Sequence, residues 1–414
     1  MMKTEFDVLI IGGGAAGLSA ALSASNQGAR AAVLEAAPRV GRKILASGNG
    51  RCNLANTGPL NYPGGASLAR RVLENCPADR VLAFFHGLGL LTVQEEQGRV
   101  YPACGQAAAV LDVLRGALER RSIPVLSETP TVRIEQAGAG FRLHTPRGVY
   151  GARAVVAACG GMAGGKLGHD GGAYRLLTDL GHTLIPPRPA LTPLMAEKAA
   201  VKGLSGLRLP AILTLCRRKD GKPFAQSQGE ALFTDYGVSG VCAMELSRSA
   251  GEEKEKSGAW PLLYLDFSPM LGLAPRRYFV TDAPEDPFRN EPAALALLKE
   301  RLHILPREAL LKGLAPRLLA ERLAGQDIEN LARSLTAFPV PLAGVRGMDA
   351  AQVTAGGIRT GEFDPDTLES RLVPGLFAAG EMLDVDGGCG GFNLLFAFAS
   401  GLTAGENAAR IAPD

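Results

Sequence analysis

The first 35 residues show the clearest pattern of apolar and polar positions in the chain. Residues 8–11 form an unbroken apolar run, which is typical of a strand buried on both faces of a parallel sheet. A glycine-rich turn follows at residues 12–17, and the small and apolar residues up to about 27 predict a helix. A second apolar run at 31–34 predicts another strand. This order of strand, tight turn, helix and strand predicts a Rossmann-like α/β unit.

The turn has the glycine spacing of a dinucleotide-binding site. Gly12 lets the chain turn, Gly14 lets the backbone approach a pyrophosphate, and Gly17 lets the helix pack against the sheet. Glu35 ends the second strand eighteen residues after Gly17, where its carboxylate can accept the hydroxyls of an adenosine ribose. Such turns also occur without a ligand, but the strand, the helix and the acid together favour dinucleotide binding. These residues alone do not show whether the bound dinucleotide is FAD or NAD.

The pattern changes at the proline-rich residues 186–189. Before them, the sequence predicts helices at 68–74, 78–88, 107–121 and 173–180, antiparallel strands at 131–135, 141–145 and 149–153, and a buried strand at 154–161. After them, it predicts short strands such as 211–216 and 262–267, a helix at 241–249, helical spacing over 287–335, strands at 351–358 and 376–379, and a last helix from Leu394 to about Ile411.

The composition of the chain limits which binding partners and which cellular compartment are expected for the protein. The 414 residues are 46% hydrophobic and 21% charged, as in an ordinary globular protein long enough for two or three domains. The formal net charge of +3, without blocks of like charge, argues against nucleic acid or an anionic membrane as a partner. Seven cysteines without a C-x-x-C pair, and only five histidines, favour a reduced cytoplasmic compartment and no metal site.

Two uncharged stretches, 8–29 and 387–405, have about the length of a membrane span. Both are rich in glycine, so buried cofactor turns are the better interpretation, and no membrane span is predicted. Glu5 and Asp7 precede the first apolar run, which argues against a signal peptide.

Residues 38–56 form a long segment dense in glycine, asparagine and cationic side chains. A loop of this length in a compact domain is usually functional. Its cations, Arg42, Lys43 and Arg51, suit a phosphate, and its asparagines add hydrogen-bonding capacity. The alternative is a solvated basic loop without a ligand.

The C-terminal segment contains a second set of candidate cofactor contacts. The strand at 376–379 ends at Gly380 and Glu381, whose carboxylate can bind ribityl or ribose hydroxyls. Glycines at 387–391 then lead into the last helix, whose N-terminal N–H groups and dipole would stabilise negative charge on a reduced flavin. For Glu381 and Asn393 the alternative roles are helix capping and turn formation.

Four segments together resemble the BaiN-like family of bacterial FAD-dependent oxidoreductases, also called YhiN-like or aminoacetone-oxidase-type flavoproteins. They are residues 41–53, 232–240, 353–357 and 380–393. The resemblance implies an α/β fold with a Rossmann-like, two-dinucleotide-binding FAD domain, an inserted β-rich domain and a small helical lid. We expect the FAD domain at 1–190 and 351–414, the barrel-like β-rich domain at 191–270, and the helical lid with a return segment at 271–350.

The sequence departs from the family pattern at two places. The usual Tyr-Pro-x-x-Gly-Ser-Thr-Gly-Asp-Gly after the buried glycine pair is replaced at residues 162–171, and the usual Tyr-Asn-Phe-Gln-Trp is replaced at 392–396. Both segments are expected near the flavin, so the substrate or the electron acceptor can differ from those of relatives.

On this basis we predict one non-covalent FAD per chain. The predicted cofactor contacts are Gly12, Gly14, Ala16, Gly17, Glu35, Lys43, Ser47, Gly48, Asn49, Arg51, Cys52, Asn53, Val132, Gly160, Gly380, Glu381, Gly391, Phe392 and Asn393. Val132 is assigned to the adenine through its backbone, because the strands around it join the sheet beside that end. No catalytic residue and no metal ligand are predicted.

The leading hypothesis is a flavoenzyme that takes a hydride at FAD N5 from a donor such as NAD(P)H and passes it to a small organic acceptor. Only one glycine fingerprint has an acid at ribose distance, so NAD(P)H is expected to bind only transiently. A disulfide reductase is disfavoured, because Cys52 has no neighbouring thiol. An oxidase using O₂, and a non-enzymatic FAD-containing redox sensor or binding module, stay open as alternatives.

Overall fold

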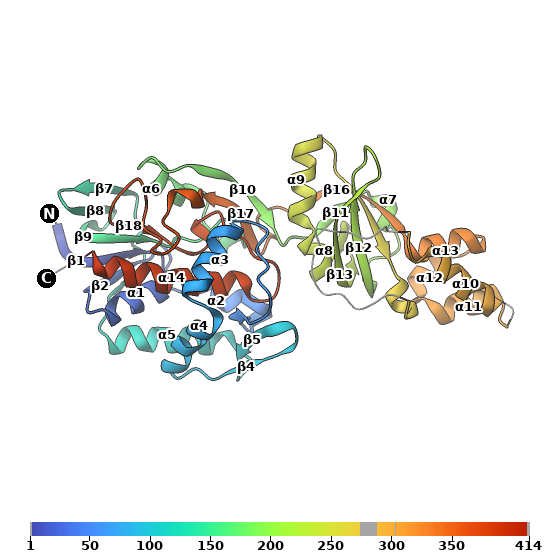
Figure 1. Cartoon of the computed structure of the whole chain (residues 1–414), viewed down its shortest axis with the longest axis horizontal. Helices are drawn as coiled ribbons and strands as arrows, with labels where there is room; N and C mark the ends of the chain where they lie inside the picture. The colour runs from blue at the N-terminus through green and yellow to red at the C-terminus, as the bar shows by residue number, and fades with distance from the viewer. Residues whose placement is uncertain (1, 274–287, 303, 412–414) are drawn as a thin grey trace. The chain divides into compact units, whose positions relative to one another are not determined.

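The structure is a computed structural model that describes residues 2–273, 288–302 and 304–411 (Figure 1). The chain divides into two compact units. Unit 1 contains Met1–Arg188 and Val353–Asp414, and unit 2 contains Pro189–Gln352. The chain therefore leaves unit 1 after its first 188 residues, forms unit 2, and returns to complete unit 1.

Unit 1 is built on a mixed sheet with strand order β6-β2-β1-β9-β8-β7, and β18 also pairs with β9. The strands are β1 (Met2–Ile11), β2 (Ala31–Leu34), β6 (Val125–Leu126), β7 (Arg133–Ala137), β8 (Gly140–Thr145), β9 (Gly148–Ala157) and β18 (Leu376–Ala378). Strands β6, β2, β1, β9 and β18 run parallel, whereas β7 and β8 form an antiparallel meander with β9. The runs 8–11, 31–34 and 154–157 are buried throughout, as in a parallel sheet covered on both faces.

Strand β9 joins the meander to the parallel part of the sheet. The two strands predicted at 149–153 and 154–161 are one continuous strand, Gly148–Ala157. Its first half pairs with β8 and its second half with β18. The sequence pattern changes along it because the strand is partly exposed at Gly148, Val149 and Arg153, whereas residues 154–157 are buried on both faces. That change was wrongly interpreted as a break between strands.

The helices described in unit 1 are α1 (Ala15–Asn26), α2 (Arg42–Ala46), α3 (Ala66–Asn75), α4 (Ala78–Gly87), α5 (Ala107–Arg120), α6 (Arg175–Thr178) and α14 (Phe392–Arg410). The helix predicted at 173–180 is shorter, because a 3₁₀ turn at Gly172–Tyr174 precedes α6. Two small sheets complete the unit: β3 (Ala55–Asn56), β5 (Arg99–Pro102) and β4 (Thr92–Gln94), and β10 (Leu184–Ala190) with β17 (Val353–Ile358). No helix among the described residues is long and apolar enough to cross a membrane.

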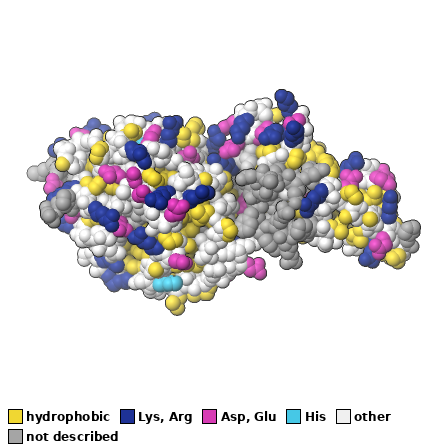
Figure 2. All heavy atoms as spheres, in the orientation of Figure 1, with side chains coloured by type: hydrophobic (Ala, Val, Ile, Leu, Met, Phe, Trp, Pro, Cys, Tyr) yellow, Lys and Arg dark blue, Asp and Glu magenta, His cyan; other side chains and the backbone are white. Residues whose placement is uncertain are grey.

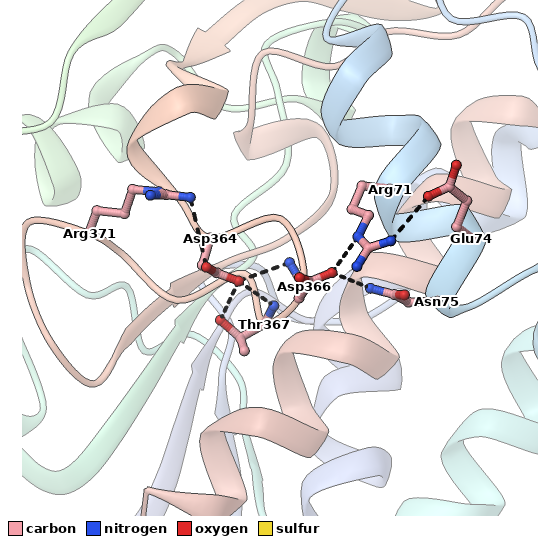
Figure 3. A network of polar contacts seen from close by, with 7 residues as sticks. All are labelled: Arg71, Glu74, Asn75, Asp364, Asp366, Thr367 and Arg371. Atoms are coloured by element: carbon pink, nitrogen blue, oxygen red, sulfur yellow. Dashed lines mark hydrogen bonds and ion pairs between the residues drawn. The ribbon is translucent and has the colours of Figure 1, made fainter.

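The connection between β17 and β18 is fixed to α3 at the surface (Figure 3). Arg71 Nε and Asn75 Nδ2 both donate to Oδ1 of Asp366, at 2.5 and 2.8 Å. Asp364 Oδ1 accepts the N–H groups of Asp366 and Thr367 and so shapes the turn. Because these side chains are largely exposed, they orient the connection but contribute little to stability.

Unit 2 contains a closed antiparallel barrel with strand order β11-β14-β13-β12-β15-β16. Its elements are β11 (Leu194–Ala196), α7 (Lys198–Val201), β12 (Arg208–Cys216), β13 (Pro223–Phe233), β14 (Gly237–Ser239), α8 (Val241–Glu245), α9 (Ser247–Ser257), β15 (Leu262–Asp266), α10 (Glu291–Leu302), α11 (Arg307–Leu314), α12 (Arg317–Leu323), α13 (Ile328–Thr336) and β16 (Phe338–Val345). Leu213, Leu263 and Phe338 of the barrel share one apolar core with Leu298 and Leu319 of the helices.

The main fold-class prediction is confirmed, since the chain combines a Rossmann-type α/β part with a six-stranded barrel. The single helix predicted at 241–249 is wrong, because the chain forms α8 and α9 on either side of Leu246. The role of α10–α13 as a lid stays a prediction.

Candidate functional site

In the glycine turn between β1 and α1, Gly12 and Gly17 pack closely against neighbouring backbone. Gly12 has φ +105° and donates its N–H to the carbonyl of Leu34 at 2.8 Å. A methyl group at Gly12 would overlap the carbonyl oxygen of Ala158, and one at Gly17 would overlap that of Gly12. At Gly14, in contrast, a methyl group would meet nothing within 4 Å. The protein's own packing requires two of the glycines, and the middle one leaves room for a ligand to approach the backbone.

Glu35 is held at this turn by backbone donors. Its Oε2 accepts the N–H of Gly13 and its Oε1 accepts the N–H of Ala37, both at 2.6 Å. Each carboxylate oxygen keeps a further lone pair after these bonds. The side chain is thus fixed beside the N-terminus of α1 with acceptor capacity left for two ribose hydroxyls, and these residues fit the adenosine and pyrophosphate part of a dinucleotide.

A polar cluster joins three of the four segments that carry the family resemblance. Lys43 Nζ on α2 donates to Glu381 Oε2 at 2.9 Å and to the carbonyl of Gly161 at 3.4 Å. Glu381 Oε1 accepts the N–H of Thr354 at 2.8 Å, and the Thr354 hydroxyl accepts the N–H of Ala163 at 2.9 Å. The side chains of Lys43 and Glu381 are 31% and 20% exposed, so this ion pair lies at the edge of the site and not in the core.

The second glycine turn leads into α14. Gly391 is the N-cap residue, with φ +100°, and no side chain caps the helix. Helix α14 is mostly buried, yet Asn393, Leu394 and Ala397 in its first turns are partly exposed and lie along one side. This side is nearly apolar and ends at the free N–H groups of the helix, which suits a flat, largely apolar ring that gains negative charge on reduction.

Helices α1 and α14 lie side by side (Figure 1) and approach closely through small residues. A methyl group at Gly401 would overlap the carbonyl oxygen of Ala16, and one at Gly405 would overlap that of Ala20. The register 16 to 401 and 20 to 405 means that the helices run in the same direction. Residues 392–399 therefore extend about 12 Å beyond the start of α1, at about 1.5 Å per residue. Two uncapped helix N-termini face the same end of unit 1 at different heights, as an elongated dinucleotide requires.

Other predicted contacts have partners within the protein. Asn393 Oδ1 accepts the N–H of Gly387 at 2.8 Å and its Nδ2 donates to the carbonyl of Gly387, so its side chain forms the turn and does not cap α14. The guanidinium of Arg51 bonds Glu95 and lies 4.1 Å from the ring centre of Tyr101. Phe392 is buried in the core.

The rest of the 47–53 segment has an unusual backbone. Gly48, Asn49 and Cys52 have φ values of +57°, +54° and +58°. The hydroxyl of Ser47 donates to the carbonyl of Ile44 and so closes α2. Asn53 Oδ1 is buried beside Gly391 and has no hydrogen-bond partner, which leaves it an unsatisfied acceptor at the second glycine turn.

At the predicted adenine contact, the N–H of Val132 donates to His144 O at 2.8 Å, so only the carbonyl of Val132 is left for a ligand. Thr131 was missed by the sequence analysis. Its hydroxyl is buried without a partner, one residue before Val132. No sequence pattern marks such an atom, because the lack of a partner appears only after folding.

His169 and Tyr174 were also missed, although they lie in or next to the segment that departs from the family pattern. His169 Nε2 lies 3.0 Å from Gly160 O, and its Nδ1 accepts the N–H of Gly171 at 2.9 Å. Burial, together with the charge of Lys43, lowers the pKa of His169. Tyr174 packs edge-on against this ring, and its hydroxyl is buried without a hydrogen-bond partner. The neutral imidazole thus holds the 160–171 loop in shape.

Two of the cysteines near the cofactor motifs are poor thiolates. Burial raises the pKa of Cys52 to about 11. Burial and the nearby charge of Glu35 raise the pKa of Cys159 to about 12. Thiol redox chemistry needs the opposite shift. This electrostatic environment favours the interpretation of both residues as packing side chains.

Comparison with known proteins assigns the chain to a family. Residues 6–407 match the model described as the HI0933-like protein Rossmann domain. The chain is 36% identical over 408 residues to 3-dehydro-bile acid delta(4,6)-reductase of Clostridium scindens, covering 97% of this chain and 98% of that protein. It is 28% identical over 408 residues to the ribosomal RNA dihydrouridine synthase of Escherichia coli, covering 96% of each chain.

Solved structures support the fold. An open flavocytochrome c3 fumarate reductase matches with a TM-score of 0.50 and 17% identity, over all of this chain and 79% of that one. The 3-ketosteroid-delta4-(5alpha)-dehydrogenase of Rhodococcus jostii matches with a TM-score of 0.50 and 14% identity, over 99% and 98% of the two chains. With the glycine turns described above, these findings agree with an FAD cofactor and an oxidoreductase activity. The chain belongs to the HI0933-like family of Rossmann-type flavoproteins and is an FAD-dependent oxidoreductase.

Proposed function

We propose that this enzyme passes a hydride from NAD(P)H to a small organic acceptor in which a C=C bond is conjugated to a carbonyl group. FAD, when bound, supplies the hydride-transfer chemistry at N5. In balance, NAD(P)H and one proton are consumed, the C=C bond becomes a single bond, and NAD(P)⁺ is released. The protein contributes binding, orientation and electrostatic stabilisation.

The observation that carries this proposal is the parallel pair of uncapped helices. Gly14, the N-cap residue of α1, lies beside the fixed carboxylate of Glu35, and Gly391, the N-cap residue of α14, lies farther along the same direction. We assign the first N-terminus to the pyrophosphate and the second to the pyrimidine edge of the flavin ring. N–H groups that are already oriented stabilise charge formed during a two-electron reduction without reorganising.

The polar cluster supplies the middle of the site. Glu381, fixed by Lys43 and by the N–H of Thr354, presents its remaining lone pairs at the partly exposed edge. We assign it to the ribityl hydroxyls. Lys43 balances the carboxylate charge there, so a bound cofactor with two phosphates does not meet an unpaired anion.

The acceptor class is taken from the chemistry that the named relatives have in common. One relative is named as a reductase of a 3-dehydro-bile acid at its delta(4,6) positions and the other as a synthase of dihydrouridine. Both names describe addition of two electrons and two protons to a C=C bond conjugated to a carbonyl. The greater identity to the first relative favours a small molecule. Figure 2 supports this choice, because Lys and Arg side chains are interspersed with Asp and Glu on the face in view.

The test is an anaerobic titration of the flavin absorbance. NADH or NADPH should bleach the bound FAD, and a cyclic enone should restore its colour under argon. Free FAD with the same reagents is the control. Recovery of colour by O₂ alone would replace the proposal by an oxidase, and recovery only by unmodified ribosomal RNA would assign a uracil acceptor. If neither pyridine nucleotide bleaches the flavin, the proposed donor is wrong.

A further inference from the structure

The turn that leads into α14 is held by side chains from a segment more than 300 residues earlier in the chain. Asn56 Nδ2 donates to the carbonyl of Gly390 at 2.7 Å, and the hydroxyl of Tyr62 donates to the carbonyl of Phe392 at 2.8 Å. Both side chains are more than nine-tenths buried. The backbone also takes part, since the carbonyl of Asn61 accepts the N–H of Gly388 at 2.9 Å.

These bonds fix peptide planes. In a trans peptide, the C=O of one residue and the N–H of the next lie in one plane and point in opposite directions. The bond from Asn56 to Gly390 therefore directs the Gly391 N–H away from Asn56. The bond from Tyr62 to Phe392 does the same for the N–H of Asn393. Gly390 and Gly391 have φ values of +116° and +100°, so without side-chain partners this turn would have many other orientations available.

We propose that Asn56 and Tyr62 are positioning residues that orient the Gly391 and Asn393 N–H groups toward the bound flavin and thereby raise its reduction potential. The inference rests on the assignment of the α14 N-terminus to the flavin ring and deepens it. The partly exposed, nearly apolar side of α14 at Asn393, Leu394 and Ala397 is the surface on which the ring lies.

The remaining bonds of Asn56 support a role in orientation. Its Oδ1 accepts the N–H of Gly58 at 2.8 Å, and its Nδ2 also lies 3.2 Å from the carbonyl of Gln97. The amide is thus held in one orientation by three backbone groups. The ring of Tyr62 packs edge-on against Phe392 and Phe396, with centroid distances of 5.9 and 6.2 Å. Its hydroxyl can be removed while this packing remains.

The experiment compares FAD-loaded wild type with Tyr62→Phe and Asn56→Ala. The control is Tyr150→Phe, which removes the hydroxyl of another buried tyrosine, in the half of β9 that pairs with the meander. The readouts are the two-electron reduction potential, from anaerobic equilibration with reference dyes, and the Kd for sulfite, from bleaching of the flavin absorbance. Sulfite adds to oxidised flavin and places negative charge on the same ring, so it reports the same N–H groups.

Loss of one orienting hydrogen bond should weaken sulfite binding by roughly threefold in Tyr62→Phe and roughly tenfold in Asn56→Ala. At about 30 mV per tenfold for two electrons, the potential should fall by about 14 and about 30 mV. If both variants keep FAD and match the Tyr150→Phe control in both readouts, the proposed role is overturned. If Asn56→Ala does not retain FAD, Tyr62→Phe decides alone. Neither readout uses an acceptor, so failure of the enone proposal leaves this test intact.

Discussion

The two glycine turns of unit 1, which we assign to the two ends of one cofactor, are held in different ways. The first, at residues 12–17, is closed by its own backbone, by β2 and by the end of β9. The second, at 387–391, is held by Asn56, Asn61 and Tyr62, which are more than 300 residues away in sequence. The first turn is formed mainly within its own strand-helix-strand unit, with one further neighbour at the end of β9, whereas the second is held by residues far away in sequence.

This difference has consequences for the stability of the fold and for the reduction potential of the bound flavin. In a turn closed mainly by backbone contacts, with Glu35 as a side-chain partner of Gly13, substitution of a glycine forces the strand or the helix to move. A turn held by side chains can be adjusted by single hydrogen bonds while the fold remains. We therefore expect substitutions in the first turn to affect folding and FAD retention, and those around the second to affect mainly the properties of the bound flavin.

The largest effect is expected at Gly17. In Gly17→Ala the new methyl group overlaps the carbonyl oxygen of Gly12, so the strand or the helix must move. We expect a loss of at least about 3 kcal/mol of unfolding free energy, and loss of FAD. Urea denaturation and the flavin content of the purified protein measure both. Gly116→Ala, within α5, is the control and should be neutral or stabilising. A Gly17→Ala protein of normal stability would show that the turn can adapt.

Gly14→Ala separates folding from binding at the same turn. Its methyl group meets nothing within 4 Å, and its φ of −86° suits any residue, so stability should change by less than about 0.5 kcal/mol. The methyl group does occupy the space assigned to the pyrophosphate, and FAD affinity should fall by roughly 10- to 100-fold. Fluorescence titration of the apoprotein with FAD measures this. Unchanged affinity would place the pyrophosphate elsewhere.

The contrast between the two turns also explains what the sequence could predict. The first turn was predicted because the contacts of Gly17 with Gly12 and of Glu35 with Gly13 lie within one strand-helix-strand unit and impose a fixed spacing. The second was predicted as a helix start beside the flavin, without the contacts that hold it. The bonds from Asn56 and Tyr62 connect positions 330 or more residues apart, and no periodicity records such pairs. The unsatisfied atoms of Thr131 and Asn53 were missed for the same reason.

In unit 2, short strand-like runs predicted a β-rich region and the family resemblance implied a barrel, but neither indicated which strand closes it. Strand β16 completes the barrel by pairing with β11 and β15, although α10–α13 lie between it and β15 in sequence. The residues of β16 lie in the segment that the sequence predicts to form the lid and the return. A strand pattern indicates that a strand forms, whereas its neighbours depend on how the intervening helices bring the chain back.

A further long-range contact predicts the pH dependence of stability. His182 is completely buried, with Nδ1 3.0 Å from Glu362 Oε2 and Nε2 2.9 Å from the hydroxyl of Ser370. Burial lowers its pKa, so the folded state holds it neutral while the unfolded chain binds a proton near pH 6.5. Its stabilising contribution is therefore present above about pH 6.5 and is lost as the pH falls below it.

His182→Gln should remove this dependence. Between pH 7.5 and 5.5 the wild type should lose about 1 kcal/mol more unfolding free energy than the variant, by urea denaturation. The pKa of Glu362 is lowered, mainly by hydrogen bonds from Thr183 and His182 acting against burial, so its own contribution is lost only below about pH 4.5. Both proteins contain His169, so its contribution to the pH dependence of the unfolding free energy cancels in the comparison. Equal pH slopes would mean that His182 is protonated in the folded state.

The smallest effect is expected at Cys52, which belongs to the 47–53 segment described above. With a pKa of about 11, roughly one thiol in a thousand is ionised at pH 8, so alkylation by iodoacetamide should be slow compared with the exposed Cys104. Cys52→Ser should retain FAD, remain reducible by the same donor, and keep turnover within about tenfold, a barrier change of about 1.4 kcal/mol or less. Peptide mapping after alkylation and steady-state kinetics test the two parts. A larger loss of turnover in folded, FAD-replete Cys52→Ser, together with rapid alkylation of the wild-type residue, would make the thiol part of the mechanism and contradict hydride transfer through the flavin alone.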